Sequence, residues 1–280
     1  MFTIQNGPEL KVSLVITTYN RPDALELILR SVFRQTVLPD EIVIGDDGSG
    51  PATREVIERM RKESPVPVVH VWHEDKGIRI SEIRNKAILA SSGDYIIQID
   101  GDIVLERHFI GDPLSVAEPG RFVTGSRVSL SQRASRRLLA GRRQPDWRVV
   151  RLGYIWNFVR LWPMRRLMQH RYKQEDHWYV RGCNMAFWRK DFFAANGYNE
   201  QIVNWGHEDS ELTFRMGNAG IKKSFLKFAG VAFHLYHENA SRAYEQGHRQ
   251  IVADVCRTAR TRCEYGVDRH IGDNSYRVDR

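Results

Sequence analysis

The sequence lacks long apolar runs, a leader-like start and a cysteine framework. It contains no run of about 18 apolar residues, so we expect no membrane-spanning helix. The first residues, MFTIQNGPELK, have neither the basic end nor the apolar stretch of a secretory signal. The cysteines Cys183, Cys256 and Cys263 are odd in number and without metal-ligand spacing, which argues against a disulfide framework. We therefore expect a reducing, cytoplasmic setting.

Internal repeats and low-complexity linkers are also missing. A chain of 280 residues can form one large α/β domain or two smaller ones, and its 42% hydrophobic content suffices for a substantial core. Because no linker divides the chain, we expect one continuous unit rather than two independent domains.

Acidic residues are almost absent from one segment, Arg133 to Lys173. It contains twelve Lys or Arg and one acid, Asp146, so it carries +11 of charge; the whole chain carries +8, which leaves −3 elsewhere. Aromatic residues lie among these arginines: Trp147, Trp156, Phe158, Trp162 and Tyr172. RLGYIWNFVRLW could form a short amphipathic helix. Three interpretations stay open: a solvated, partly mobile insert, a nucleic-acid contact, or a surface that rests on anionic lipid.

Short β-branched segments alternate with amphipathic helical ones. We expect strands at 12–17, 41–45, 66–72 and 94–99, and helices after Pro22, at about 52–62 and at 79–90. This alternation predicts an α/β fold with a mostly parallel sheet flanked by helices. The first, second and fourth strands end in polar groups (17–20, 46–49 and 100–102), and in such sheets these ends form one ligand-binding rim.

The motif Asp100-Gly101-Asp102 interrupts an apolar stretch, IIQIDGDIVL. Two carboxylates this close repel each other and are costly to desolvate unless a cation neutralises them. Mg²⁺ and Mn²⁺ often bind one or two carboxylates together with substrate phosphates. The alternative is an ordinary solvated turn, in which Asp-Gly-Asp is common. The flanking apolar residues favour a metal site.

Four segments together resemble family-two glycosyltransferases of the GT-A type: VSLVITTYNRPDALELILRSVFRQT, EIVIGDDGS, RNKAILASSGDYIIQIDGDIV and WGHEDSEL. The resemblance covers roughly Val12 to Asn239, apart from the basic insert. It implies a Rossmann-like GT-A sheet with a smaller, galactosyltransferase-like acceptor region. On this basis we divide the chain into a nucleotide-sugar-binding half (1–130), a basic aromatic insert (131–176), an acceptor and catalytic half (177–240) and a helical tail (241–280).

The resemblance implies that Asp100 and Asp102 hold Mn²⁺ or Mg²⁺ against the diphosphate of a nucleotide sugar. Related enzymes supply a histidine to the metal about 25 residues after the acidic pair. His234 lies 25 residues after Asp209, so it is the first candidate, with His237 close behind. Both histidines lie in VAFHLYHE (231–238), which we expect to be a strand, and a histidine in a strand is otherwise often a core residue.

The resemblance also implies a donor site for the nucleotide sugar. Asp47 is expected to accept a hydrogen bond from a uracil ring N–H, although Asp46 and Asp47 also suit plain turn chemistry. Lys and Arg side chains can donate charge-assisted hydrogen bonds to a diphosphate, but each of those expected at the site could instead be a solvated surface charge. The expected donor-site residues are Thr17, Tyr19, Arg21, Asp47, Lys76, Arg84, Asn85, Asp100 and Gly101.

The segment NWGHEDSEL resembles the Trp-Gly-Gly-Glu-Asp motif of galactosyltransferase-like enzymes, with His207 in place of the second glycine. An inverting transfer needs a carboxylate that takes the proton from the acceptor hydroxyl. We predict Asp209 for this role and Glu208 for orienting substrate hydroxyls; the alternative is that both acids favour the start of a helix. The expected acceptor-site residues are Trp205, Gly206 and Asn184.

These observations predict an inverting, metal-dependent hexosyl- or N-acetylhexosaminyltransferase. The expected donor is a nucleotide-diphosphate sugar, most simply a UDP-sugar, and the acceptor a glycan or lipid-linked glycan such as a bacterial surface polysaccharide. The enzyme would be cytoplasmic, with peripheral contact to the inner face of an anionic membrane, and no nucleic-acid partner is expected. Two alternatives stay open: a sugar nucleotidyltransferase, which would not need the Trp-Gly-x-Glu-Asp segment, and a membrane- or RNA-binding module built on the insert.

Overall fold

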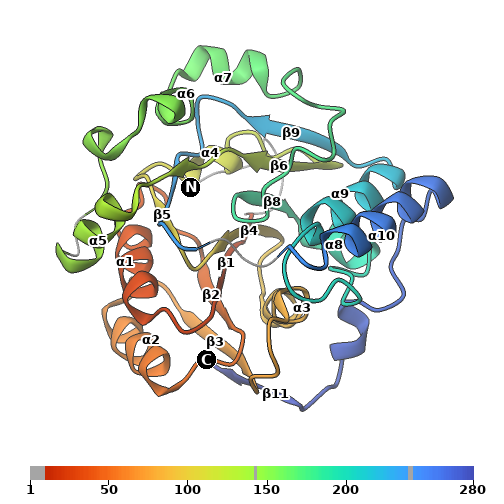
Figure 1. Cartoon of the computed structure of the whole chain (residues 1–280), viewed down its shortest axis with the longest axis horizontal. Coiled ribbons are helices and arrows are strands. Elements are labelled where there is room, and N and C mark those ends of the chain that lie inside the picture. The colour runs from red at the N-terminus through yellow and green to blue at the C-terminus, as the bar shows by residue number, and fades with distance from the viewer. Residues whose placement is uncertain (1–9, 142–143, 239–241) are drawn as a thin grey trace.

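A computed structural model describes residues 10–141, 144–238 and 242–280. Its central sheet has eight strands in the order β11-β3-β2-β1-β4-β8-β6-β9 (Figure 1). The four strands β3, β2, β1 and β4 are parallel, which confirms the predicted α/β class. A second, three-stranded sheet has the order β5-β10-β7. The strands of the central sheet span β1 Val12–Thr18, β2 Glu41–Asp46, β3 Val68–His73, β4 Tyr95–Asp100, β6 Arg121–Gly125, β8 Met185–Trp188, β9 Lys222–Leu226 and β11 Tyr276–Asp279. Those of the second sheet span β5 Ile103–Leu105, β7 Val128–Ser129 and β10 Ala232–His234.

Helices cover both faces of the central sheet (Figure 1). Successive side chains of a strand point to opposite faces. Along β1, Leu14 and Ile16 pack in the core layer that also holds residues of α1 and α2, while Val15 packs in the layer that holds residues of α3, α8 and α9. The α-helices span α1 Pro22–Val32, α2 Pro51–Glu63, α3 Ile80–Ala90, α4 Gly111–Leu114, α5 Gln132–Gly141, α6 Ile155–Phe158, α7 Trp162–Met168, α8 Arg189–Ala194, α9 Glu208–Asn218 and α10 Glu245–Thr258.

The strands and helices predicted in the first hundred residues are present, with small shifts at their ends. The third strand begins at Val68 rather than at residue 66, and Pro67, which lacks an N–H, immediately precedes it. The predicted strand 231–238 is shorter, because β10 ends at His234. The domain boundaries placed at residues 130 and 176 divide one sheet, since β8 and β9 lie beside strands of the first half.

The tail, expected to be helical over 241–280, is helical only in part. After α10 and a short 3-10 turn the chain adds β11, which pairs antiparallel with β3 at the edge of the central sheet. The Arg277 guanidinium lies 5.0 Å from the centre of the Trp72 ring across this pair. The last strand therefore covers an edge that would otherwise be open to pairing with another chain.

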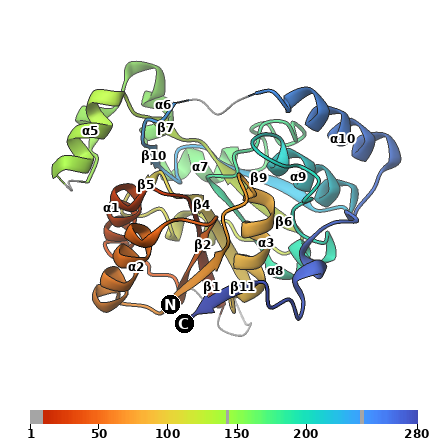
Figure 2. The same ribbon diagram turned by 60° about the horizontal axis from the view of Figure 1, so that its bottom comes forward.

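The basic insert folds as a series of short helices along one side of the molecule. The amphipathic helix expected over RLGYIWNFVRLW is a 3-10 turn, Leu152–Tyr154, followed by the single turn of α6. Figure 2 shows α5 and α6 at one end of the molecule and α10 at the other. Within residues 10–141, 144–238 and 242–280, no helix has the length and apolar character needed to span a bilayer. All three cysteines are unpaired, and only Cys256 is exposed.

Candidate active site

The ends of β1, β2 and β4 meet at one rim, as predicted. Parallel pairing places Thr17 opposite Asp100, and Thr18 opposite Asp46. The Gly101 amide donates to the Thr17 carbonyl oxygen at 2.6 Å. A Cβ atom at position 101 would lie 2.7 Å from that oxygen, so a larger residue could not follow Asp100 without displacing β1. The glycine thus lets the two aspartates leave the strand close to its neighbour.

Three side chains form a candidate metal centre at this rim: Asp102, His234 and His237. Their ligand atoms all lie within 4.8 Å of one another. The Nε2 atoms of His234 and His237 are 3.3 Å apart, and they lie 3.4 and 3.3 Å from Asp102 Oδ2. β10 ends at His234, and the irregular segment that follows places the His237 ring beside that of His234. Both histidines therefore lie beside Asp102, although His234 was the first candidate and His237 the second.

The cluster fits a divalent cation on three grounds. Asp102 Oδ1 is buried and has no hydrogen-bond partner among the described residues, which is costly for a carboxylate oxygen. Burial and the nearby Arg127 lower the pKa of His234 to about 3, so its imidazole is neutral, as a metal ligand must be. Burial and the charge of Asp100 raise the pKa of Asp102 to about 6, a sign that positive charge is missing there.

Asp100 stands apart from this cluster and bonds instead to Arg84. The buried guanidinium of Arg84 donates from Nη2 to Asp100 Oδ1 at 2.7 Å and from Nη1 to Glu208 Oε1 at 2.9 Å. These two ion pairs join the Asp-Gly-Asp motif to the Glu-Asp motif, 106 residues later. Burial raises the pKa of Glu208, and the Arg84 charge offsets part of that rise. Arg84 therefore joins both acidic motifs, and its contact with the donor stays a prediction.

Arg84→Met should lower the free energy of unfolding by about 3 kcal/mol, because removing one partner of a buried ion pair leaves the other charge uncompensated. The partial exposure of Asp100 keeps the expected loss at the lower end of the usual range. Denaturant unfolding would measure it. The double variant Arg84→Met/Glu208→Gln is the control, and it should recover part of the loss. Equal stability of parent and single variant would contradict the bridging role.

Asp209 lies at the start of α9 and is more accessible than Glu208. Its Oδ2 accepts from the Gly182 amide at 2.9 Å, and its Oδ1 accepts from the Ser210 amide at 2.7 Å. A Cβ at Gly182 would lie 3.3 Å from Arg84 Nη2, so this glycine fits between the arginine and the acid. Gly182 was not predicted as a site residue, because it carries no motif of its own. The Asp209 carboxylate is thus fixed in orientation while part of it faces solvent.

The turn after β2 is held by buried histidines. His73 Nε2 lies 2.6 Å from Asp47 Oδ1, and the Arg79 amide donates to Asp47 Oδ2 at 2.9 Å. Lys86 Nζ lies 3.2 Å from His73 Nδ1, on the other side of the ring. Each oxygen of Asp47 therefore has one protein partner and can accept a second hydrogen bond. His73 and Lys86 were not predicted as site residues. The alternation of residues along β3 does not distinguish a buried histidine that has a hydrogen-bond partner from one that has none.

Asp46 has a structural role, in line with the turn chemistry considered for it. It lies 3.0 Å from His70 and accepts from the Ser49 amide at 2.8 Å. Nearby, the Tyr19 hydroxyl donates to Asp75 at 2.9 Å, and the Tyr19 side chain is exposed at the rim. Arg21 lies 3.9 Å from Asp102. Tyr19 and Arg21 are thus placed at the rim where a donor was expected.

Two residues expected at the substrate site hold backbone instead. Asn85 is fully buried, and its amide bonds Tyr198 through both N–H and C=O and also bonds Glu200. The Asn184 amide donates to the carbonyl oxygens of residues 126 and 230. Because these amide groups are buried and hydrogen-bonded, Asn85 and Asn184 fix loops in this structure, and their predicted substrate contacts stay predictions. Lys76 is exposed and pairs with Glu74 at 3.1 Å.

The acceptor motif lies directly before α9. Trp205 is exposed and Gly206 has a φ of 116°, a conformation that favours glycine. His207 also has a positive φ, 69°, which explains physically why glycine suits this position in the family motif. Its ring lies 3.8 Å from Glu245 of α10 and edge-on to Trp178. The His207 side chain therefore contacts α10.

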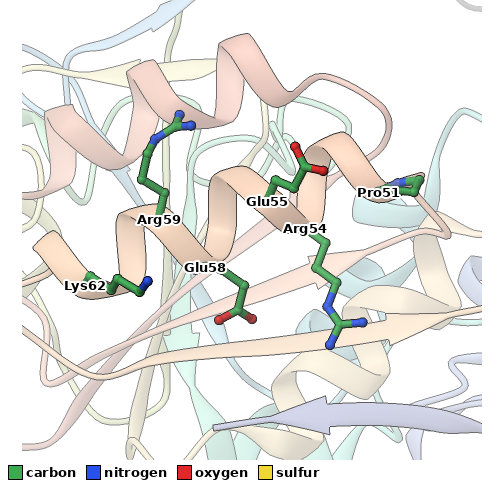
Figure 3. A pocket seen from close by; sticks show the side chains of 6 residues that line it. All are labelled: Pro51, Arg54, Glu55, Glu58, Arg59 and Lys62. Atoms are coloured by element: carbon green, nitrogen blue, oxygen red, sulfur yellow. The ribbon is translucent and has the colours of Figure 1, made fainter.

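A separate hollow of about 490 Å³ lies along α2 (Figure 3). Its charged side chains have mixed signs, and Arg59 bonds Glu26 of α1 at 2.6 Å. None of the residues predicted for the site lines this hollow, so it is not a candidate for the chemistry.

Comparison with known families agrees with this geometry. The profile of glycosyl transferase family 2 matches residues 13–193, and that of the N-terminal domain of galactosyltransferase matches residues 163–238. Chondroitin synthase of Escherichia coli is 25% identical over 236 residues, which cover 75% of this chain and 32% of that protein. Validoxylamine A glucosyltransferase of Streptomyces hygroscopicus subsp. limoneus is 27% identical over 221 residues, covering 75% and 48%. The chain thus spans between a third and a half of the length of these relatives.

Solved structures share the fold. S. aureus TarS 1-349 in complex with UDP superposes with a TM-score of 0.59 at 15% identity, covering 88% of this chain and 65% of that one. The mannosyltransferase PcManGT from Pyrobaculum calidifontis, in complex with GDP-Man and Mn²⁺, gives 0.60 at 17% identity, covering 89% and 65%. The family match extends over more than half of the chain and includes the rim formed by β1, β2 and β4. The chain therefore belongs to glycosyl transferase family 2.

Proposed function

We propose that the protein is an inverting, metal-dependent glycosyltransferase that moves a sugar from a nucleotide-diphosphate sugar to a glycan acceptor. One observation carries the proposal: Asp102 of the Asp-Gly-Asp motif lies with two histidines in a group that could hold a cation, and Arg84 joins this motif to the Glu-Asp motif that contains Asp209. Asp102, His234 and His237 would hold Mn²⁺ or Mg²⁺, and Asp100 stays a predicted further ligand. The bound cation would supply positive charge for the departing diphosphate.

The residues of the chain account for the remaining steps. Asp209, fixed by two amides, takes the proton from the acceptor hydroxyl as that oxygen attacks the sugar. A single in-line displacement through an oxocarbenium-like state inverts the anomeric centre. Glu208, held by Arg84, orients sugar hydroxyls. At the other end of the donor, Asp47 accepts a hydrogen bond from the ring N–H of the base, and Tyr19 and Arg21 lie along the rim.

A UDP-sugar is the donor that we propose. Asp47 presents acceptor oxygens only, which suits the ring N–H of uracil. TarS, with a similar fold, has been solved with UDP and with UDP-GlcNAc, although PcManGT carries GDP-Man. Relatives named as chondroitin and hyaluronan synthases support a glycan acceptor, which Trp205 would contact by stacking on a sugar ring.

A screen of nucleotide sugars for metal-dependent hydrolysis tests the proposal, because slow donor hydrolysis needs no acceptor. We expect release of UDP from one UDP-sugar with Mn²⁺ or Mg²⁺ present, and NMR of the transferred sugar to show the inverted anomer. Release of pyrophosphate from a nucleoside triphosphate and a sugar phosphate would instead indicate a nucleotidyltransferase. Retention of the anomeric configuration would contradict a single displacement with Asp209 as the base.

We also propose that the insert makes peripheral contact with anionic lipid on the cytoplasmic side of a membrane. Its exposed apolar side chains lie close together in sequence and among exposed arginines, a combination that suits the lipid–water interface. The most exposed are Leu152 (91%), Trp147 (66%), Trp156 (63%) and Leu167 (55%). The insert contains three Arg-Arg pairs, at 136–137, 142–143 and 165–166. Arg136, Arg137 and Arg166 are exposed, whereas Arg165 is buried and lies 3.5 Å from Asp112. The pair at 142–143 lies outside the described residues. The buried Arg165 therefore cannot serve as a lipid contact.

Leu152→Ser/Trp156→Ser/Leu167→Ser should weaken binding to vesicles of phosphatidylglycerol and phosphatidylcholine by about tenfold or more, since each side chain would lose apolar burial. Vesicle co-sedimentation measures this. Leu38→Ser/Ile271→Ser, at exposed apolar sites outside the insert, is the matched control and should bind like the parent. If the parent never binds these vesicles, the membrane proposal is wrong.

A further inference from the structure

The basic insert contains a groove with a strongly one-sided charge. A hollow of about 680 Å³ lies between α5 and residues 148–151. Arg133 and Arg137 line it from α5, and Arg148 and Arg151 line it from the opposite segment. None of the described residues that line it is acidic. The other lining residues are Ser131, Ala134, Leu138, Gly141, Val149 and Val150.

These arginines have few partners of opposite charge. Arg148 lies 3.7 Å from Asp146, and both side chains are exposed, so this pair is weak. Arg133, Arg137 and Arg151 form no ion pair with any residue in the described part of the chain. Like charges gathered around a concave surface repel one another and concentrate a positive potential there. A bound anion would relieve that repulsion.

The groove rests on a packed support. Leu138 is buried, and Val149 and Val150 pack against the main hydrophobic core. The backbone segments that carry the arginines are therefore held in place by packing against the core. A guanidinium has a planar set of donors that matches carboxylate and phosphate oxygens in pairs. Four of them around one hollow suit a ligand with several anionic groups.

One end of the groove lies beside the candidate metal centre. The Leu130 amide donates to the His234 carbonyl oxygen at 3.0 Å, and Ser131 of the groove follows directly. The Tyr236 amide donates to Ser135 Oγ of α5 at 2.8 Å. The segment that carries both histidines is thus bonded to the start of α5. A chain-like ligand in the groove could extend from there toward the rim.

We propose that this groove binds anionic groups, carboxylate or phosphate, of a glycan acceptor. The inference rests on the proposed glycosyl transfer and adds the substrate class: an acidic rather than a neutral glycan. The apolar lipid-facing side chains of the insert are different residues, none of which lines the groove.

The test compares two triple variants of the full chain with equal loss of charge. Arg133→Gln/Arg137→Gln/Arg151→Gln changes the groove, and Arg136→Gln/Arg166→Gln/Arg171→Gln changes exposed arginines of the insert outside it. The probes are an unsulfated chondroitin oligosaccharide, the same oligosaccharide with its carboxyl groups reduced, an oligomer of glycerol phosphate, and phosphatidylglycerol vesicles. Calorimetry measures the oligosaccharides and co-sedimentation the vesicles.

We expect at least one anionic oligomer to bind the parent, and the groove variant to bind it about tenfold or more weakly, since several charge-assisted hydrogen bonds are lost. The matched variant should stay within about threefold, the scale of a screened surface charge. The carboxyl-reduced oligosaccharide should bind weakly to all three proteins. Equal losses in both variants, no binding of either oligomer, or an effect seen only with vesicles would each overturn the proposal.

Metal-dependent donor hydrolysis, measured in the same variants, separates this proposal from the proposed function. Neither triple variant should reduce it, because none of the substituted residues lies at the donor rim. Hydrolysis without groove-dependent oligomer binding leaves the transferase proposal intact and removes the acidic acceptor. Groove-dependent binding in a protein that never hydrolyses a nucleotide sugar would support the anion-binding groove and contradict the transferase proposal.

Discussion

Asp102→Asn should lower the affinity for Mn²⁺, measured by calorimetry with UDP present, by about 10²-fold or more, above the range usual for loss of a supporting residue. The physical reason is the position of Asp102 between both histidines, with one oxygen left without a partner in the described residues. An amide at this position offers one neutral oxygen in place of a charged carboxylate. Removing a carboxylate charge from this partly buried position should not unfold the protein.

Asp100→Asn is the matched control, because Asp100 lies on the same motif but bonds to Arg84. It should reduce Mn²⁺ affinity less than Asp102→Asn does. Equal losses would mean that Asp100 also binds the metal directly, as the family motif implies. Unchanged Mn²⁺ affinity in Asp102→Asn would contradict the assignment of the metal centre to this rim.

Asp209→Asn should reduce the rate of sugar transfer by about 10²-fold or more, the effect expected for loss of a general base. The amide oxygen can still accept from the Gly182 amide, so the local shape is kept. Binding of the donor should stay near the parental value, since Asp209 acts on the acceptor. Transfer rates at saturating donor, together with calorimetry of UDP, separate the two effects.

Glu208→Gln is the comparison for this prediction. Glu208 bonds to Arg84 and is buried, so its loss should affect donor or acceptor affinity and stability more than the proton transfer. Near-normal transfer in Asp209→Asn with strong loss in Glu208→Gln would move the base to Glu208.

The parallel sheet and its rim could be predicted from the sequence because they follow from periodicity. Apolar strands such as 12–17 and 95–99 are buried on both faces, and their polar ends show where the rim lies. His234 and His237 were each predicted as candidates, but their joint placement at Asp102 could not be predicted, because alternation places residues three apart on different faces of a strand. It depends on the path of the chain beyond β10, which has no signature in the sequence.

The roles of Asn85, Asn184 and Arg84 needed the structure for a similar reason. Buried asparagine and arginine side chains look the same in a sequence whether they bond backbone, another side chain or a ligand. Their partners lie far away along the chain: Tyr198 for Asn85, and Glu208 for Arg84. Only tertiary contacts decide between structural support and substrate binding.

The most direct test of the account is the thermal stability of the parent protein with UDP, with and without Mn²⁺ or Mg²⁺. A ligand that binds only the folded state at a hundred times its Kd stabilises it by about 2.7 kcal/mol. We predict a clear rise in Tm with UDP and metal together, and little change with UDP in the presence of a chelator. The same rise with and without the chelator would contradict a metal-dependent donor site built on Asp102, His234 and His237.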